Sequence, residues 1–91
     1  LAEGMVQVFL QLAPERLSRL SAAARRGDTA KLAEEAQRIA SAAQRIAAAG
    51  VSECTRAITR AAAAGDYSQV EEQLVRLSAQ IAALEHPATA V

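Results

Sequence analysis

With 91 residues, the chain is long enough for one small domain around a single core. Aromatic residues make up only 2% of it, and alanine supplies much of its 52% hydrophobic content, which excludes a β-sandwich. Ten basic and ten acidic residues cancel, so the net positive charge typical of nucleic-acid-binding proteins is missing. Zero net charge also gives weak repulsion between copies, which permits a weak homodimer.

No apolar run reaches the length of about 18 residues that a membrane-spanning helix needs, so we expect no membrane insertion. The single cysteine cannot form an internal disulfide, and we expect a cytoplasmic protein. Because the first residue is Leu1 rather than Met, we expect the chain to be a part or a trimmed form of a longer protein.

The first predicted helix covers residues 2–26. Its broad apolar stripe consists of Met5, Phe9, Leu12, Leu17, Leu20 and Ala24. Pro14 lacks an amide hydrogen and its ring clashes with the carbonyl group of Leu10, so we expect a kink there, or a short helix that runs into a longer one. Gly27 and Asp28 then provide a helix end and an N-cap.

The second predicted helix covers residues 29–48, with Glu34 and Arg38 paired on its polar side. Its core stripe, at spacings of four and three residues, is Leu32, Ala36, Ile39, Ala43 and Ile46. Gly50 separates it from a third predicted helix over residues 51–64. The core stripe of that helix is Val51, Cys54, Ile58 and Ala61.

A second Gly-Asp pair, Gly65 and Asp66, precedes the fourth predicted helix, which covers residues 67–85. Asp66 and Gln69 form an approximate capping box. The core stripe is Val70, Leu74, Leu77, Ile81 and Leu84. A smaller apolar stripe, Val75, Ala79 and Ala82, contacts either a partner, a second copy or the first helix, and we favour the first helix. After the helix, residues 87–91 are expected to form a frayed tail.

Four helices with short connections predict an all-α fold, an antiparallel up-down-up-down four-helix bundle in one domain of residues 1–86. The second and fourth helices align without gaps at an offset of 38 residues, which matches Leu32 with Val70 and Ile39 with Leu77. This alignment indicates either a weak internal repeat or only the shared requirements of helix packing, and the second interpretation is the simpler one.

Residues suited to catalysis or metal binding are scarce. The single histidine, His86, follows the last helix and is expected to cap its end, while Cys54 lies on a core stripe and is expected to act as a small hydrophobe. The adjacent glutamates at 34–35 and 71–72 lack the histidine three residues on that di-iron bundles use, so we interpret them as solvated charges. We expect no catalytic residue, no metal and no cofactor.

A Phe-Leu-x-x-x-Pro segment from Phe9 to Pro14, the two Gly-Asp pairs, the long helix between them and the leucine-rich last helix span nearly the whole chain. Together these features resemble a histidine-containing phosphotransfer (HPt) domain. In that family the second long helix carries a His-x-Leu-Lys-Gly-Ser signature, whose histidine takes a phosphoryl group from one receiver aspartate and passes it to another. The resemblance implies a module of bacterial two-component signalling.

Placed on this sequence, the signature falls on residues 37–42. Gln37 stands at the position of the phosphoryl-accepting histidine, Ala40 replaces the lysine and Ser41 replaces the glycine. Further on, Ala47 stands where the family tends to have a glycine. The lone pair of the Gln37 amide nitrogen is delocalised into its carbonyl group, so Gln37 cannot accept a phosphoryl group. The sequence therefore predicts a degenerate HPt domain that is not an enzyme and has no phosphotransfer activity.

A docking surface can remain after the acceptor is lost. We expect it on the face of the second helix opposite the core stripe, at Gln37, Arg38, Ala40, Ser41, Gln44 and Arg45. The expected partner is a receiver domain or a histidine kinase of a two-component system, with no nucleic acid involved. Two alternatives stay open: this face is ordinary solvated surface, or the chain is a structural or oligomerisation bundle unrelated to phosphorelay.

Overall fold

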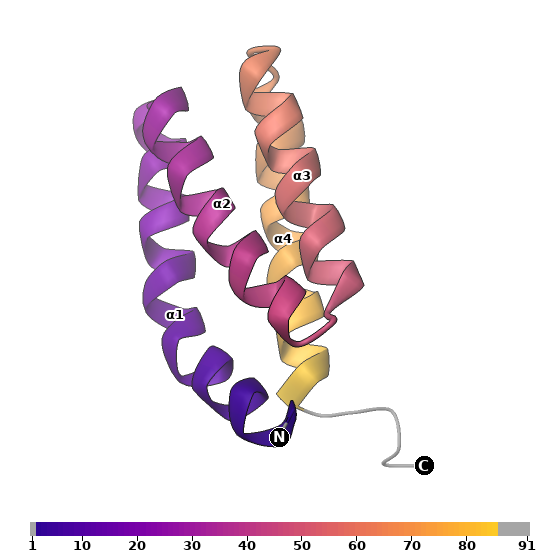
Figure 1. Ribbon diagram of the computed structural model, residues 1–91. Coiled ribbons are helices and arrows are strands. Elements are labelled where there is room, and N and C mark those ends of the chain that lie inside the picture. Colours follow the sequence, from indigo (N-terminus) through magenta and orange to yellow (C-terminus); the bar gives the residue numbers. More distant parts are fainter. Residues whose placement is uncertain (1, 86–91) are drawn as a thin grey trace.

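The computed structural model describes residues 2–85, which form four helices (Figure 1). The helices are α1 (Ala2–Arg26), α2 (Thr29–Arg45), α3 (Ala49–Ala63) and α4 (Tyr67–Glu85). Each helix packs against the next one in the chain and α4 also packs against α1, which closes the bundle. The predicted antiparallel four-helix bundle is confirmed. The capping role expected of His86 and the expected tail 87–91 lie outside the described residues.

Two of the three turns use the Gly-Asp pairs as the sequence predicts. Gly27 and Gly65 have φ angles of 66° and 75°, in the left-handed region that glycine adopts without strain. The carboxylates of Asp28 and Asp66 then accept hydrogen bonds from backbone amides three residues on, each at 3.1 Å. These side chains satisfy amide groups that the first turn of a helix leaves without partners, and so fix where α2 and α4 begin.

The third turn differs from the prediction. Helix α2 ends at Arg45 and α3 begins at Ala49, so Gly50 lies inside α3 and does not separate the two helices. The left-handed residue of this turn is Ala47, with φ 57°. A Cβ atom at Gly50 would meet only the end of the exposed, flexible Gln80 side chain on α4, which can move aside.

Helix α1 continues through Pro14 without interruption. Figure 1 shows its N-terminal part bending away from the direction of the rest of the helix, which is expected when a proline lies inside a helix. The expected kink therefore takes the form of a bend in one long helix.

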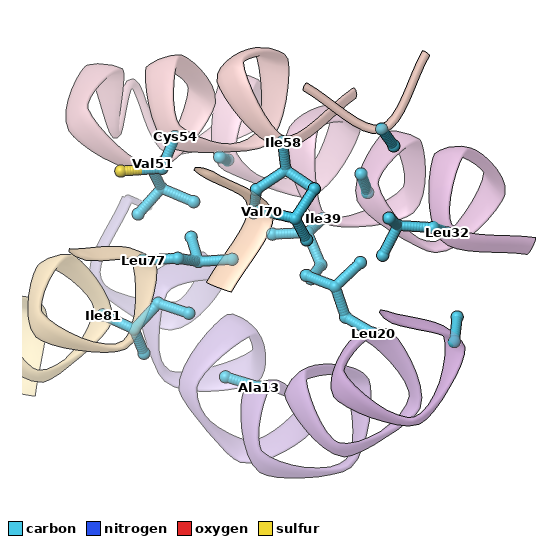
Figure 2. Packing of buried hydrophobic residues seen from close by; sticks show 14 of the residues in the cluster. Ala13, Leu20, Leu32, Ile39, Val51, Cys54, Ile58, Val70, Leu77 and Ile81 are labelled. Carbon is cyan, nitrogen blue, oxygen red and sulfur yellow. The ribbon is translucent and has the colours of Figure 1, made fainter. Parts of the chain in front are cut away.

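The core is formed by apolar side chains from all four helices, which meet between them (Figure 2). The fully buried large apolar residues are Leu20, Leu32, Ile39, Val51, Ile58, Val70 and Leu77. The predicted stripes of α2, α3 and α4 are confirmed in outline, with Ile46, Leu74 and Leu84 only partly buried.

The broad apolar stripe of α1 is only partly buried. Met5 and Leu12, which belong to it, are 42% and 43% exposed. Val75 is 71% exposed, so the small stripe of α4 does not pack on α1. The apolar arc of α1 is wider than the surface that α2 and α4 cover, and its excess side chains face solvent.

The offset of 38 residues has a structural counterpart. The hydroxyl groups of Thr29 and Tyr67, which open α2 and α4, share a hydrogen bond of 2.7 Å. The contact brings the first residues of α2 and α4 together at one end of the bundle, which the antiparallel packing of four helices also requires.

Among residues 2–85, no helix combines the length and the apolar character needed to cross a membrane.

Candidate protein-docking site

The outer face of α2 carries the residues that the sequence singled out. Leu32, Ile39 and the other core residues of α2 point into the bundle, and with 3.6 residues per turn Gln37, Ser41 and Gln44 point outward. All three are exposed. The Gln37 Nε2 atom donates a hydrogen bond of 3.3 Å to the Ser41 Oγ, so the carboxamide lies along the helix surface.

A shallow groove of 420 Å³ runs beside this face. It is lined by Arg16, Gln37, Arg38, Ser41, Ala42 and Arg45, and we call it the basic groove. Four of the six predicted docking residues line it. Gln44 is exposed outside it, and Ala40 is partly buried and does not line it.

Arg16 of α1 is a site residue that the sequence reasoning missed. It places a third guanidinium group beside those of Arg38 and Arg45. Arg38 lies 3.5 Å from the Glu34 carboxylate, whereas Arg16 and Arg45 form no ion pair with the described residues. The groove is therefore positively charged. The predicted antiparallel packing of the first two helices could have indicated Arg16, because it brings the middle of α1 beside the second half of α2.

A second groove of 480 Å³ continues from the first between α1 and α2, and we call it the apolar groove. It shares Arg16, Ala42 and Arg45 with the basic groove, and its other lining residues are Gly4, Met5, Val8, Phe9, Leu12 and Ile46. The exposed side chains Met5, Val8 and Leu12 are the ones that the core leaves uncovered. An apolar patch with a cationic rim is a typical composition for a protein-docking surface.

Glu35 departs from the prediction that the paired glutamates are solvated. Its side chain is only 1% exposed. It lies two turns before Ala42 on the side of α2 that faces α1. The Lys31 Nζ lies 3.6 Å from its Oε2, and its Oε1 has no hydrogen-bond partner. A charged side chain is thus held in the α1–α2 interface with half of its carboxylate unsatisfied.

Cys54 is buried, as expected for a small hydrophobe, with 8% of its surface exposed. Burial raises the pKa of its thiol, an effect that Glu53 reinforces and Arg76 opposes. A thiol held in its neutral form is a poor nucleophile. Within the described part of the chain, no group of three or more His, Cys, Asp or Glu residues is placed to hold a metal ion.

A family model described as "Hpt domain" matches residues 4–87, which is nearly the whole chain. The chain belongs to the HPt domain family. HPt domains are phosphotransfer modules of two-component phosphorelays rather than enzymes, and they interact with receiver and kinase partners. Neither the curated proteins nor the solved structures gave a match to the chain.

Ala47, where the resemblance places a glycine of the family, has a φ of 57°, in the left-handed region that favours glycine. An alanine in this conformation is strained.

Proposed function

We propose that this HPt domain docks a receiver domain or a histidine kinase without accepting a phosphoryl group. It acts as an interaction module of a bacterial, cytoplasmic two-component signalling protein, folded as one domain of residues 1–86. The observation that carries the proposal is the exposed Gln37 on the wall of the basic groove, at the position where the resemblance places the acceptor histidine.

The chemistry of Gln37 supports the loss of transfer. Its carboxamide nitrogen has no free lone pair with which to attack phosphorus, and it donates a hydrogen bond to the Ser41 hydroxyl. Nucleophilic catalysis at this position requires a basic nitrogen or an activated oxygen. Ala40 lacks the positive charge of the lysine in the family signature, and Ser41 has a side chain where the signature has glycine.

The surroundings of Gln37 support the retention of docking. Receiver domains carry an acidic pocket around their aspartate, and the three arginines of the basic groove complement it. The apolar groove provides the surface for a tighter contact. Rim charges chiefly raise the association rate, and this effect weakens as salt shortens the Debye length.

The first test is phosphoryl transfer from a phosphorylated receiver domain, followed by intact mass or radiolabel. We expect no adduct on the wild-type domain and little on Gln37→His alone. The triple variant Gln37→His, Ala40→Lys, Ser41→Gly should accept phosphate, because it restores the nucleophile, the nearby cation and the close approach. An acid-labile adduct on the wild-type chain would contradict the proposal.

The second test compares the Ser41→Trp variant with the wild-type domain. Calorimetry measures the affinity of each for the receiver domains of the source organism. Ser41 is exposed, so a melting curve should scarcely change, but the indole blocks the groove and should weaken binding by at least about tenfold. Ser18→Trp on the exposed face of α1 is the matched control and should bind like wild type. Equal affinity of Ser41→Trp and wild type would place docking elsewhere.

The alternative is a structural or oligomerisation bundle that resembles the family only in composition. The family match over residues 4–87 argues against it. Absence of binding to every receiver and kinase domain in the second test would favour this alternative. A weak homodimer stays part of the proposal, since zero net charge gives only weak repulsion between copies.

A further inference from the structure

The two hairpins of the bundle carry equivalent outer faces. At the offset of 38 residues, Gln37, Ser41 and Gln44 on α2 correspond to Val75, Ala79 and Ala82 on α4. All six side chains are exposed. The small stripe on α4, which the core does not use, therefore corresponds by sequence offset to the candidate docking face of α2.

The correspondence extends to charged contacts. The ion pair of Glu34 with Arg38 on α2, at 3.5 Å, recurs on α4 as Glu72 with Arg76, at 3.9 Å. Thr29 and Tyr67, which open the two helices at the same offset, contact each other through their hydroxyl groups.

A groove also lies beside this face of α4, as one does beside α2. It has a volume of 620 Å³ and runs between α3 and α4. Three arginines line it, Arg56, Arg60 and Arg76, against one carboxylate, Glu53. Of these three arginines, only Arg76 lies 38 residues after an arginine of the basic groove, Arg38. Each groove therefore has three guanidinium groups, but mostly from residues that do not correspond.

An apolar side chain takes the central position on α4. Val75 is 71% exposed, and Ala79 and Ala82 beside it are small enough for a partner to approach the helix closely. A cationic groove next to an exposed apolar stripe fits an acidic protein surface with an apolar centre. Glu71 and Glu72 lie exposed one turn before Val75, so the attraction for an acidic partner comes from the arginines of the groove and not from the stripe.

Both faces can be occupied together. Helices α2 and α4 each pack mainly against α1 and α3, so they lie diagonally across the bundle and their outer faces point away from each other (Figure 1). A partner on one face therefore does not cover the other.

We propose that this domain has a second docking face, formed by α4 and the arginines of the α3–α4 groove, for a second acidic receiver domain. The inference rests on the proposed function, because it assigns to α4 the class of partner proposed for α2. It makes the domain a two-sided connector, with one receiver domain on each side.

The test is stoichiometry, measured by calorimetry and by sedimentation of the wild-type domain with the receiver domain that it binds most tightly. We expect two receiver domains per HPt domain. The equivalent variants Ser41→Trp and Ala79→Trp should each bind one, and the double variant none. Ser18→Trp is the control and should bind two. Melting curves of all variants should match that of wild type, because every substituted residue is exposed.

The outcomes separate the two proposals. One receiver domain per wild-type chain, lost in Ser41→Trp but kept in Ala79→Trp, overturns the second face and leaves the proposed function standing. No binding at all overturns both. If the domain alone sediments as a dimer and Ala79→Trp makes it a monomer, the α4 face pairs with a second copy, and the second receiver site is again overturned.

Discussion

Ala47 shows how one residue can hold a turn at an energetic cost. Its φ of 57° brings the Cβ atom close to backbone atoms, a conformation that costs L-residues other than glycine about 1–2 kcal/mol. The turn is kept because the amide of Ala48 donates to the carbonyl oxygen of Ala43 at 2.9 Å. The same hydrogen bond joins Asp28 to Ala23 at 3.0 Å in the first turn, where glycine takes the left-handed position.

We therefore predict that Ala47→Gly raises the free energy of unfolding by about 1 kcal/mol. Chemical denaturation with a linear extrapolation measures the change. Ala64→Gly is the matched control, because Ala64 also ends a helix but has φ −85°, where glycine only adds freedom to the unfolded chain. The control should be destabilised. A loss of stability in Ala47→Gly would mean that the turn is not strained.

Glu35 illustrates a second cost at the level of one side chain. Its Oε1 is buried without a hydrogen-bond partner, and leaving such a group unsatisfied costs about 1–3 kcal/mol. Lys31 compensates only the other oxygen, at 3.6 Å. The helical period places Glu35 beside Leu32 and Ile39, and only the polarity of its side chain led the sequence analysis to assign it to the surface.

Replacing Glu35 with methionine keeps an unbranched side chain of similar length and removes the unsatisfied oxygen. We predict a gain in the free energy of unfolding of about 1 kcal/mol, measured by denaturant titration. The same change at Glu34, half-exposed and paired only at the surface, should stay within about 0.5 kcal/mol of wild type. If both variants behave alike, the burial of Glu35 has no energetic consequence.

At the scale of elements, α4 has two faces with different roles. Leu77 is fully buried, while Val75, two residues before it, is 71% exposed. A shift of two residues turns the side chain by about 160° around a helix of 3.6 residues per turn. One helix can therefore contribute to the core and present an apolar stripe to a partner.

This difference predicts unequal responses to truncation. Leu77→Ala should leave a cavity and cost about 2–5 kcal/mol, a large share of the stability of a small domain. Val75→Ala removes an exposed side chain and should cost no more than about 0.5 kcal/mol. Thermal melts of the two variants compare them directly. Equal losses would show that the faces of α4 are assigned wrongly.

Helices, caps and turns could be predicted only where the local sequence carries a characteristic pattern. The stripe from Leu32 to Ala43 and the caps at Asp28 and Asp66 follow from periodicity and turn chemistry, and the structure confirms them. The turn at Ala47 has no glycine and so gave no signal. On α1, Met5 and Leu12 have the spacing of core residues, but which side of a wide apolar arc is covered depends on the neighbouring helices.

At the scale of the whole molecule, the candidate docking surfaces could be predicted only in part. The outward face of α2 follows from its helical period. The grooves do not, because each needs side chains from two helices, as when Arg16 meets Arg45 across the α1–α2 interface. The pairing of Thr29 with Tyr67 likewise requires the assembled bundle.

The order of the helices also has a consequence for how fast the chain folds. Turns of two or three residues join the helices, and three of the four main helix interfaces lie between consecutive helices. Bundles dominated by such local contacts fold in about microseconds to milliseconds. Each hairpin can form early by itself, whereas the α1–α4 interface and the link from Thr29 to Tyr67 must wait until the hairpins meet. Their docking is then the step expected to limit the rate of folding.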